Sequence, residues 1–190
     1  IGTFLFNKPA YKNLIVNGLI LDKNGKKMSK SLGNAINPVS LMDSYGADIL
    51  RWYLIASSPV GNSKLFNEED LSEVQNKFFD TLINTVRFYK IYSNLADFEY
   101  GDSKITEVND RDIIDKWIIS KVNSLKSNYF ELMDDYDVSK ASRVLYDFAI
   151  DELSNWYIRR NRKRLRNPEN EKDKLAGYQT LYEVIIELLK

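Results

Sequence analysis

The sequence contains neither cysteine nor histidine in its 190 residues. Without cysteine, the chain has no disulfide and no thiolate metal site. Without histidine, it lacks the base of Ser–His and Cys–His catalysis and the usual zinc ligands. No apolar run approaches the roughly 18 residues of a transmembrane helix, so we expect no membrane partner. These absences exclude several common classes of enzyme and membrane protein.

Both ends of the chain lack the signals of natural termini. Residues 1–6 contain no initiating methionine, basic leader or cleavage site. Residues 184–189 form an apolar helical stretch that no helix-ending signal follows. We therefore expect a piece of a longer protein, and we take the cytoplasm as its location.

Net charge is zero overall, but positive charge is concentrated in two segments. Residues 22–30 carry four lysines and one aspartate, a net charge of +3. Residues 159–166 carry six cations, so the rest of the chain has a net charge of −9. Two positive segments on an acidic body indicate specific anionic partners more than diffuse coating by nucleic acid.

The first third of the chain predicts the edge of an α/β unit. Residues 14–21 form an apolar run typical of a β-strand, and the Asp-Lys-Asn-Gly sequence at 22–25 predicts a tight turn after it. Asn37 precedes a proline, which predicts a helix start. Gly46 is expected to separate this short helix from a second one over about residues 48–55.

A change of pattern divides the chain after the turn-rich residues 57–63. Beyond them, apolar residues recur at every third and fourth position, as in amphipathic helices. We predict two domains, residues 1–62 and residues 63–190. The second is an antiparallel helical bundle, because such stripes need one another for burial. The four stripes span residues 71–89 (with Gln75-Asn76 as a weak point), 114–136, 138–156 and 175–188.

Individual residues set the expected ends of the bundle helices. Asn67 and Asn109, each with an aspartate three residues on, predict helix starts, and Asp137 predicts a third. Pro168 is expected to end the third helix. Trp156 falls in the apolar stripe of that helix, so we expect it in the core.

The most informative segment is the lysine-serine loop, Lys27-Met28-Ser29-Lys30-Ser31. Lysine supplies a compact charge with three donors, and serine hydroxyls add further donors for phosphate oxygens. A solvated hairpin tip would have the same composition. Spacing alone does not identify the chemistry, and the Gly-rich run of a Walker A loop is missing.

Resemblance decides between these alternatives. The stretch DKNGKKMSKSLGNAINP, followed in register by YGADILRWYL, resembles the end of the catalytic domain of class I aminoacyl-tRNA synthetases. The resemblance implies a mainly α chain: the C-terminal edge of a doubly wound α/β (Rossmann-like) catalytic domain followed by an antiparallel helical bundle. It also implies that helical anticodon-binding domains follow the loop.

The resemblance assigns roles to the loop residues. Lys27 and Lys30 would contact the phosphates of ATP during aminoacyl-adenylate formation, with Lys30 the stronger candidate. Ser29 and Ser31 would assist or shape the loop, and Met28 belongs to the same ATP-binding segment. Structural roles are expected for four nearby residues, namely Gly33, Asn34, Asp48 and Arg51.

The basic segment near the C-terminus predicts contact with RNA. Cations at a helix end complement the helix dipole and form a phosphate-binding surface. A solvated face, ion pairs with acidic helices and a nuclear-localisation signal are the alternatives. The expected tRNA-binding residues are Arg159, Arg160, Arg162, Lys163, Arg164 and Arg166.

The sequence SNWYIRRNRKR at 154–164 resembles the anticodon-binding domain of the isoleucyl members of the family, and DKWIISKVNSL at 115–125 agrees. The isoleucyl members usually have a Phe-Trp pair after the basic run, and this sequence has Leu165-Arg166 there instead. The valyl and leucyl members share the lysine-serine loop motif and are the close alternatives. The resemblance implies that the parent enzyme is a monomer that attaches isoleucine to tRNA. Its expected ligands are isoleucine, ATP with Mg²⁺, and the anticodon stem-loop of tRNA.

The resemblance also limits what this piece does alone. The family needs a His-Ile-Gly-His type motif for adenylate formation, and the chain has no histidine. We therefore expect the isolated chain to be inactive in amino-acid activation. A non-catalytic RNA-binding helical module and a helical protein-interaction scaffold are the alternative functions.

Overall fold

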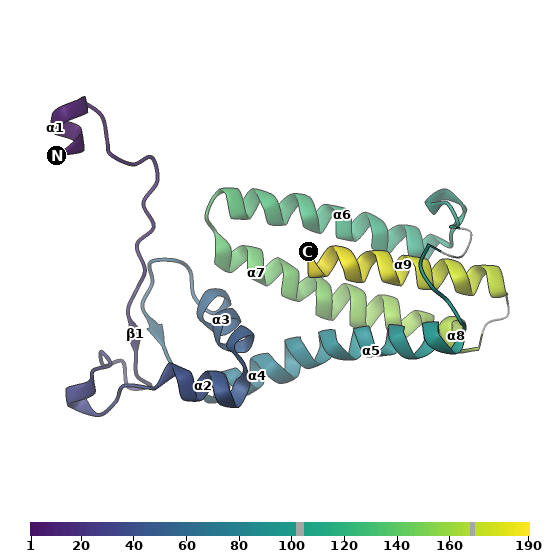
Figure 1. Cartoon of the computed structure of the whole chain (residues 1–190), viewed down its shortest axis with the longest axis horizontal. Helices are drawn as coiled ribbons and strands as arrows, with labels where there is room; N and C mark the ends of the chain where they lie inside the picture. The colour runs from purple at the N-terminus through teal and green to yellow at the C-terminus, as the bar shows by residue number, and fades with distance from the viewer. Residues whose placement is uncertain (102–104, 168–169) are drawn as a thin grey trace.

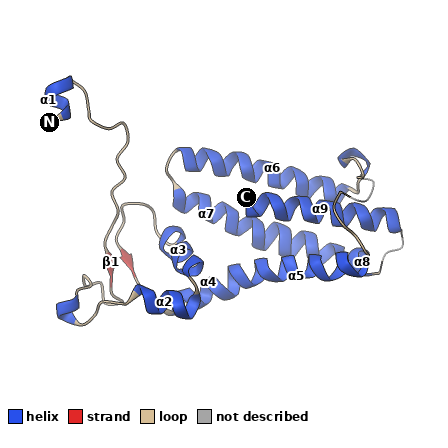
Figure 2. Ribbon diagram, viewed as in Figure 1, coloured by secondary structure: helices blue, strands red, loops and turns tan. Residues whose placement is uncertain are grey.

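The chain folds as a short N-terminal part followed by a bundle of long helices (Figure 1). The computed structural model describes residues 1–101, 105–167 and 170–190. Helices dominate these residues, and their one sheet has two strands (Figure 2). No helix of the described segments has both the length and the apolar composition needed to cross a membrane. The mainly α fold class predicted from the sequence is confirmed.

The N-terminal part contains little regular structure. α1 (Gly2–Phe6) stands apart from the remainder, and an extended segment connects it to β1 (Ile20–Leu21) (Figure 1). β1 pairs in parallel with β2 (Lys64–Leu65). The strand expected over residues 14–21 is therefore wrong for residues 14–19. A strand needs a neighbour for its backbone groups. The last two residues pair with β2, and of residues 14–19 the Leu19 carbonyl accepts the backbone N–H of Lys64 at 2.8 Å without extending the strand.

Two helices follow the lysine-serine loop as predicted. α2 (Pro38–Tyr45) begins with a proline, and the Asn37 side chain accepts the backbone N–H of Val39 at 3.0 Å. α3 (Ala47–Ala56) starts directly after Gly46, whose φ of 94° favours glycine. The N-cap and the glycine break thus lie where the sequence places them.

A small core joins these helices to the first helix of the bundle. α4 (Glu69–Val74) supplies Leu71, which is fully buried against α2 and α3 residues. Packing therefore continues across residue 62, where the sequence predicts a domain boundary. The buried members of this small core are Leu41, Ile49, Leu50, Tyr53, Phe66 and Leu71.

The first long helix of the bundle is continuous through its expected weak point. α4 passes into a π-helical stretch, η2 (Gln75–Phe79), and then into α5 (Asp80–Leu95). The wider turn of a π-helix replaces the break that Gln75-Asn76 suggested. Phe78 of this stretch stacks on Trp52 of α3, with ring centroids 4.1 Å apart. The irregular turn thus docks the first helix on α3.

Three further long helices alternate in direction and complete the predicted antiparallel bundle (Figure 1). Counting α4–α5 as the first helix of the bundle, a short 3₁₀ turn precedes the second helix, and the third consists of three consecutive elements. Their bounds are η3 (Val108–Asp110), α6 (Ile113–Asp134), α7 (Val138–Asp147), η4 (Phe148–Ile158), α8 (Arg159–Arg166) and α9 (Glu171–Leu189).

Side-chain caps begin α6 and α7. Asp112 accepts a backbone N–H at 2.9 Å, and it takes the N-cap position because Asn109 lies within η3. Asp137 caps α7 as the sequence predicts. Pro168, the expected end of the third helix, lies outside the described residues, and α8 itself ends at Arg166.

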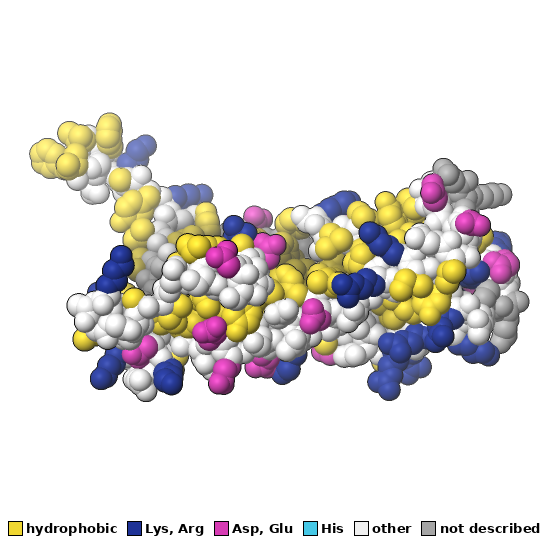
Figure 3. All heavy atoms as spheres, turned by 60° about the horizontal axis from the view of Figure 1, so that its bottom comes forward, with side chains coloured by type: hydrophobic (Ala, Val, Ile, Leu, Met, Phe, Trp, Pro, Cys, Tyr) yellow, Lys and Arg dark blue, Asp and Glu magenta, His cyan; other side chains and the backbone are white. Residues whose placement is uncertain are grey.

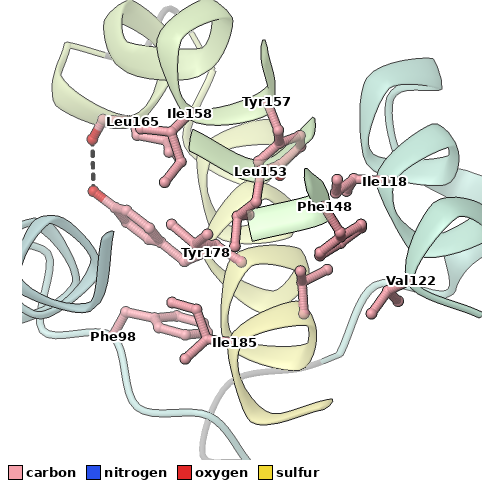
Figure 4. Packing of buried hydrophobic residues seen from close by; sticks show 12 residues of the cluster. Phe98, Ile118, Val122, Phe148, Leu153, Tyr157, Ile158, Leu165, Tyr178 and Ile185 are labelled. Atoms are coloured by element: carbon pink, nitrogen blue, oxygen red, sulfur yellow. Dashed lines mark hydrogen bonds between the residues drawn. The ribbon is translucent and has the colours of Figure 1, made fainter. Parts of the chain in front are cut away.

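The π-helical segment η4 changes which side chains face the main core. Figure 4 shows Phe148, Leu153 and Tyr157 within this core, where the Tyr178 hydroxyl donates to the carbonyl of Leu165 at 2.6 Å. Trp156, expected in the core, is instead 46% exposed. A π-helix has wider turns than an α-helix, so a stripe counted at α-helical spacing drifts away from the core face. Tyr157 is buried in its place.

Candidate functional site

A tight turn precedes the lysine-serine loop. The Asp22 carboxylate accepts the backbone N–H groups of Asn24 and Lys26, each at 2.9 Å. The backbone N–H of Asp22 also donates to the carbonyl of Lys26 at 2.8 Å. Gly25 has a φ of 78°, in the left-handed region that glycine adopts without strain. The predicted turn is confirmed, and it fixes the position from which the loop starts.

The side chain of Asn34 holds the two ends of the loop together. Its oxygen accepts the backbone N–H of Ser29 at 2.9 Å. Its amide nitrogen donates to the Asp22 carboxylate at 2.8 Å and to the carbonyl of Lys27 at 3.3 Å. The hydrogen bond from Asn34, together with the backbone donors of the turn, lowers the pKa of Asp22. The loop is therefore tied to a frame built by one amide and one carboxylate.

The two serines of the loop stabilise its conformation. Ser29 Oγ accepts the backbone N–H of Leu32 at 3.2 Å and so caps the short 3₁₀ helix η1 (Lys30–Leu32). Ser29 Oγ and Ser31 Oγ lie 2.8 Å apart and share a hydrogen bond. Both hydroxyls thus shape the loop in this structure, which matches one of the two roles expected for them.

The lysines and the methionine of the loop lie in different environments. Met28 is half-buried and packs against the small core. Lys27 and Lys30 flank it and are exposed. Among the described residues, no carboxylate forms an ion pair with either lysine. Met28 therefore anchors the loop, while both ammonium groups remain available to an anionic ligand.

An open hollow of about 460 Å³ lies beside the loop. Three carboxylates, of Asp22, Glu68 and Glu69, line it with a single lysine. Lys27 and Lys30 are not part of its lining. Because carboxylates repel phosphate, this hollow is a poor place for the phosphates of a nucleotide.

The basic segment places most of its charges on one face of α8. With about 3.6 residues per turn, Arg159, Arg162, Lys163 and Arg166 fall on one arc, Arg160 borders it, and all five are exposed. Asn161 and Leu165 are buried on the opposite side. Figure 3 shows Lys and Arg side chains gathered at the end of the bundle where α5 and α8 meet. We call these five residues the cationic face.

Arg164 differs from the other cations of the segment. Its side chain is only 14% exposed and forms ion pairs with Asp115 at 2.6 Å and Asp173 at 2.8 Å. The hydroxyl of Tyr157 donates to the same Asp115 carboxylate at 2.6 Å. Burial lowers the pKa of Arg164, but the hydrogen bonds that it donates to both aspartates outweigh burial and raise the pKa overall. Its guanidinium is thus committed to the protein interior, and we remove it from the expected tRNA-binding set.

Aromatic rings lie directly beside the cationic face. The guanidinium carbon of Arg160 is 3.8 Å from the ring centroid of Trp156, and that of Arg166 is 5.7 Å from the ring of Tyr92. Trp117 of α6 lies 6.4 Å from Trp156, between ring centroids. The surface therefore combines charge with planar groups, a composition suited to nucleic acid.

The sequence left the supporting roles of two residues unresolved. Sequence reasoning predicts only a place in the turn for Asp22 and only a structural role for Asn34. The signal for both is local, since Asp and Asn in turns commonly bond to nearby backbone groups. The exposure of Trp156 had no such signal, because it depends on the π-helical segment η4.

Two family descriptions match this chain. Residues 1–66 match the class I tRNA synthetases (I, L, M and V). Residues 115–190 match the anticodon-binding domain of tRNA ligase. The first match contains the lysine-serine loop, and the second contains the cationic face.

Curated relatives extend the likeness over the whole chain. An isoleucine–tRNA ligase of Cytophaga hutchinsonii is 46% identical over 182 residues, which are 96% of this chain and 16% of the relative. Those of Porphyromonas gingivalis and Clostridium acetobutylicum are each 40% identical over 190 residues, covering 100% of this chain and 17% and 18% of the relatives. The chain thus spans less than a fifth of the length of these relatives.

Solved structures share the fold. Mycobacterium tuberculosis methionyl-tRNA synthetase bound by methionyl-adenylate aligns with a TM-score of 0.71 and 22% identity, over 89% of this chain and 33% of that one. Agrobacterium radiobacter K84 LeuRS, in a ternary complex with tRNA and LeuAMS, aligns with a TM-score of 0.62 and 15% identity, over 90% and 20%. The loop, the helical bundle and the matches along the chain lead to one conclusion: the chain belongs to the class I aminoacyl-tRNA synthetases, as the end of their catalytic domain joined to their anticodon-binding domain.

Proposed function

We propose that the full-length protein is an isoleucine–tRNA ligase, which activates isoleucine with ATP and transfers it to tRNA. The observation that carries this proposal is the pair of exposed ammonium groups of Lys27 and Lys30, which no carboxylate of the described residues pairs, on a loop tied by Asn34. The names of the relatives support isoleucine over valine or leucine. The chain contributes the phosphate-stabilising loop and the tRNA-binding bundle.

The loop would act on the departing pyrophosphate. When the amino-acid carboxylate attacks the α-phosphorus of ATP, negative charge builds on the leaving group. Preorganised cations near that charge lower the barrier, because they need no reorientation during the step. Lys30 lies at the start of η1, and Lys27 lies at the antiparallel bridge to Leu21. The backbone holds both lysines, and within residues 1–101, 105–167 and 170–190 neither forms an ion pair. The serines keep the loop in shape, and Met28 anchors it.

ATP would bring its own Mg²⁺. In the segments that the structure describes, no group of three or more His, Cys, Asp or Glu side chains is arranged to hold a metal ion. We further propose that the enzyme is a monomer of the cytoplasm, where translation takes place.

The cationic face would bind the anticodon stem-loop of tRNA. Its five side chains are exposed and share one side of α8, so several phosphates can be contacted at once. Binding of this kind releases counterions and weakens steeply as salt increases. This surface also fits a non-catalytic RNA-binding module, which is the second candidate function. In that case the lysine-serine loop would have no role.

A pair of lysine substitutions in the full-length protein tests the proposal. Lys30→Ala should slow isoleucine-dependent pyrophosphate exchange by about a hundredfold or more, because one charged donor to the leaving group is removed. Lys23→Ala removes an exposed lysine of the adjacent turn and should leave the rate unchanged. Normal exchange by Lys30→Ala, with tRNA binding intact, would favour the non-catalytic module.

A further inference from the structure

Trp156 and Arg160 form an exposed stack on the bundle surface. The guanidinium carbon of Arg160 lies 3.8 Å from the indole centroid, a contact distance for two stacked planes. Tryptophan is usually buried for most of its area, yet Trp156 is 46% exposed. Tyr157, the next residue, takes the core position, so the exposure of Trp156 follows from the phase of η4.

A second tryptophan supports the stack, and the acidic residue four positions before Trp156 is paired. Trp117 of α6 lies 6.4 Å from Trp156 at an angle of 55° and supports one side of the indole. Glu152, four residues before Trp156, forms an ion pair with Lys121 at 2.9 Å. Lys121 Nζ also lies 6.0 Å from the ring of Trp117. The acidic group nearest along the helix is therefore already neutralised.

We propose that Trp156 and Arg160 form a stacking subsite for one unpaired base of tRNA. This inference rests on the proposed tRNA binding by the cationic face. The cationic face would contact phosphates, and the stack would contact one base. Aromatic rings and guanidinium planes both stack on bases that are splayed out of a loop. Paired bases are stacked within the duplex, so the ligand is a nucleotide of a single-stranded loop.

The charge around the stack favours RNA over an apolar protein partner. Arg159 and Lys163 lie on the same exposed arc of α8 and adjoin the stack. An apolar peptide covering Trp156 would have to desolvate Arg159, and burying a charge that the peptide does not pair is costly. A nucleotide satisfies both requirements, because its base extends the stack and its phosphate meets the cations.

Substitutions that preserve charge test the subsite in the full-length protein. Trp156→Leu should weaken tRNA binding by about tenfold or more, since a base loses its aromatic platform. The slope of affinity against salt should stay unchanged, because no cation is removed. Trp156→Phe should retain most of the affinity. Arg160→Lys keeps the charge but loses the plane, so it too should weaken binding.

The position of the base can be mapped on the RNA. In a series of tRNAs that each lack one base of the anticodon loop, one abasic position should weaken binding to the wild-type protein. The same position should have no further effect on Trp156→Leu. Thermal unfolding by circular dichroism checks that each variant folds like the wild type.

Each other outcome has a definite meaning. If Trp156→Leu binds tRNA like the wild type, or if Leu and Phe weaken binding equally, the stacking subsite is wrong. Arg162→Ala, which removes a charge of the cationic face, should still reduce the salt slope in that case, and the proposed tRNA-binding function would stand. If the wild-type protein does not bind tRNA, both proposals fall.

Discussion

At the scale of single residues, Asn34 controls the geometry of the lysine-serine loop. Its amide joins Asp22, Lys27 and Ser29, which are up to twelve positions away in the sequence. Catalytic charges are effective only when they are held close to the productive position, and small displacements are costly. Under the proposed function, Asn34 therefore acts through the lysines as a positioning residue.

Replacing Asn34 should reduce activation without affecting tRNA binding. Asn34→Ala removes all three hydrogen bonds, so we expect adenylate formation to slow by about ten- to a hundredfold as the lysines lose their fixed positions. Asn24→Ala is the matched control, because Asn24 contributes its backbone N–H to the turn. Rapid-quench measurement of isoleucyl-adenylate checks this. An unchanged rate for Asn34→Ala would show that the loop is set by other contacts.

Lys64 is a second residue with an unusual environment. It is 7% exposed, its ammonium donates to the carbonyl of Tyr53 at 2.5 Å, and it lies 3.2 Å from the centroid of the Tyr53 ring. Burial lowers the pKa of Lys64 to about 8 from 10.5, against a weaker opposing effect of Asp70. The folded state therefore releases this proton at a lower pH than the unfolded state.

The pKa of Lys64 predicts a rise of stability with pH. Between pH 8 and 10 the unfolded chain holds a proton that the folded chain has lost, so the free energy of unfolding should increase by about 2 kcal/mol. Above pH 10 the gain is opposed by Tyr53, because burial raises its pKa to about 12 and the unfolded tyrosine ionises first. Urea unfolding at several pH values measures this. Lys64→Met should abolish the rise, and a rise of equal size in that variant would contradict the assignment.

At the scale of elements, a cluster of ionic groups centred on the buried Asp115 joins α6, α8 and α9. Asp115 comes from α6, Arg164 from α8 and Asp173 from α9. Asp115 is fully buried, and Tyr157 of η4 completes its hydrogen bonding. A buried pair of this kind adds little over apolar packing, but removing one partner leaves an uncompensated charge. The cluster therefore fixes how these three helices meet.

Neutralising one member of this cluster should destabilise the bundle. Asp115→Asn removes one of the two negative charges that pair with the mostly buried Arg164. We expect the free energy of unfolding to fall by about 3 kcal/mol. Asp48→Asn is the matched control, since Asp48 pairs with Arg51 at 2.9 Å with both side chains at least 70% exposed. That variant should lose less than about 1 kcal/mol. Equal losses in urea unfolding would contradict a structural role for the buried cluster.

Elements with local causes were predictable, and those with distant causes were not. The turn at residues 22–25, the cap at Asn37 and the cap at Asp137 each depend on a few neighbouring residues, and all were predicted. The strand expected over residues 14–21 forms only at residues 20–21, because its length depends on how much of the distant segment at residues 64–65 pairs with it. The burial of Arg164 likewise depends on Asp115, 49 positions away.

The same distinction applies to the candidate site. The lysine-serine loop is contiguous, so its residues could be named from the sequence. The π-helical segment η4 arises from packing, and it moves Trp156 to the surface and Tyr157 into the core. Spacing rules assume a regular α-helix, and they fail where the helix widens.

At the scale of the whole molecule, the two candidate sites lie at opposite ends. The lysine-serine loop belongs to the N-terminal part, while the cationic face lies at the far end of the bundle (Figure 1). The small core connects the two parts, and Ser139 of α7 adds hydrogen bonds to the carbonyls of Ile55 at 2.8 Å and Ser58 at 2.5 Å. This separation predicts that substitutions at one site leave the other function intact.

Paired measurement of adenylate formation and tRNA affinity, on one variant from each site, tests this account most directly. Lys30→Ala in the full-length protein should form isoleucyl-adenylate about a hundredfold or more slowly and bind tRNA normally. Arg162→Ala should form adenylate normally and bind tRNA more weakly, with a reduced salt slope. Adenylate formation at the wild-type rate by Lys30→Ala would contradict the central claim that the loop's ammonium groups stabilise the departing pyrophosphate.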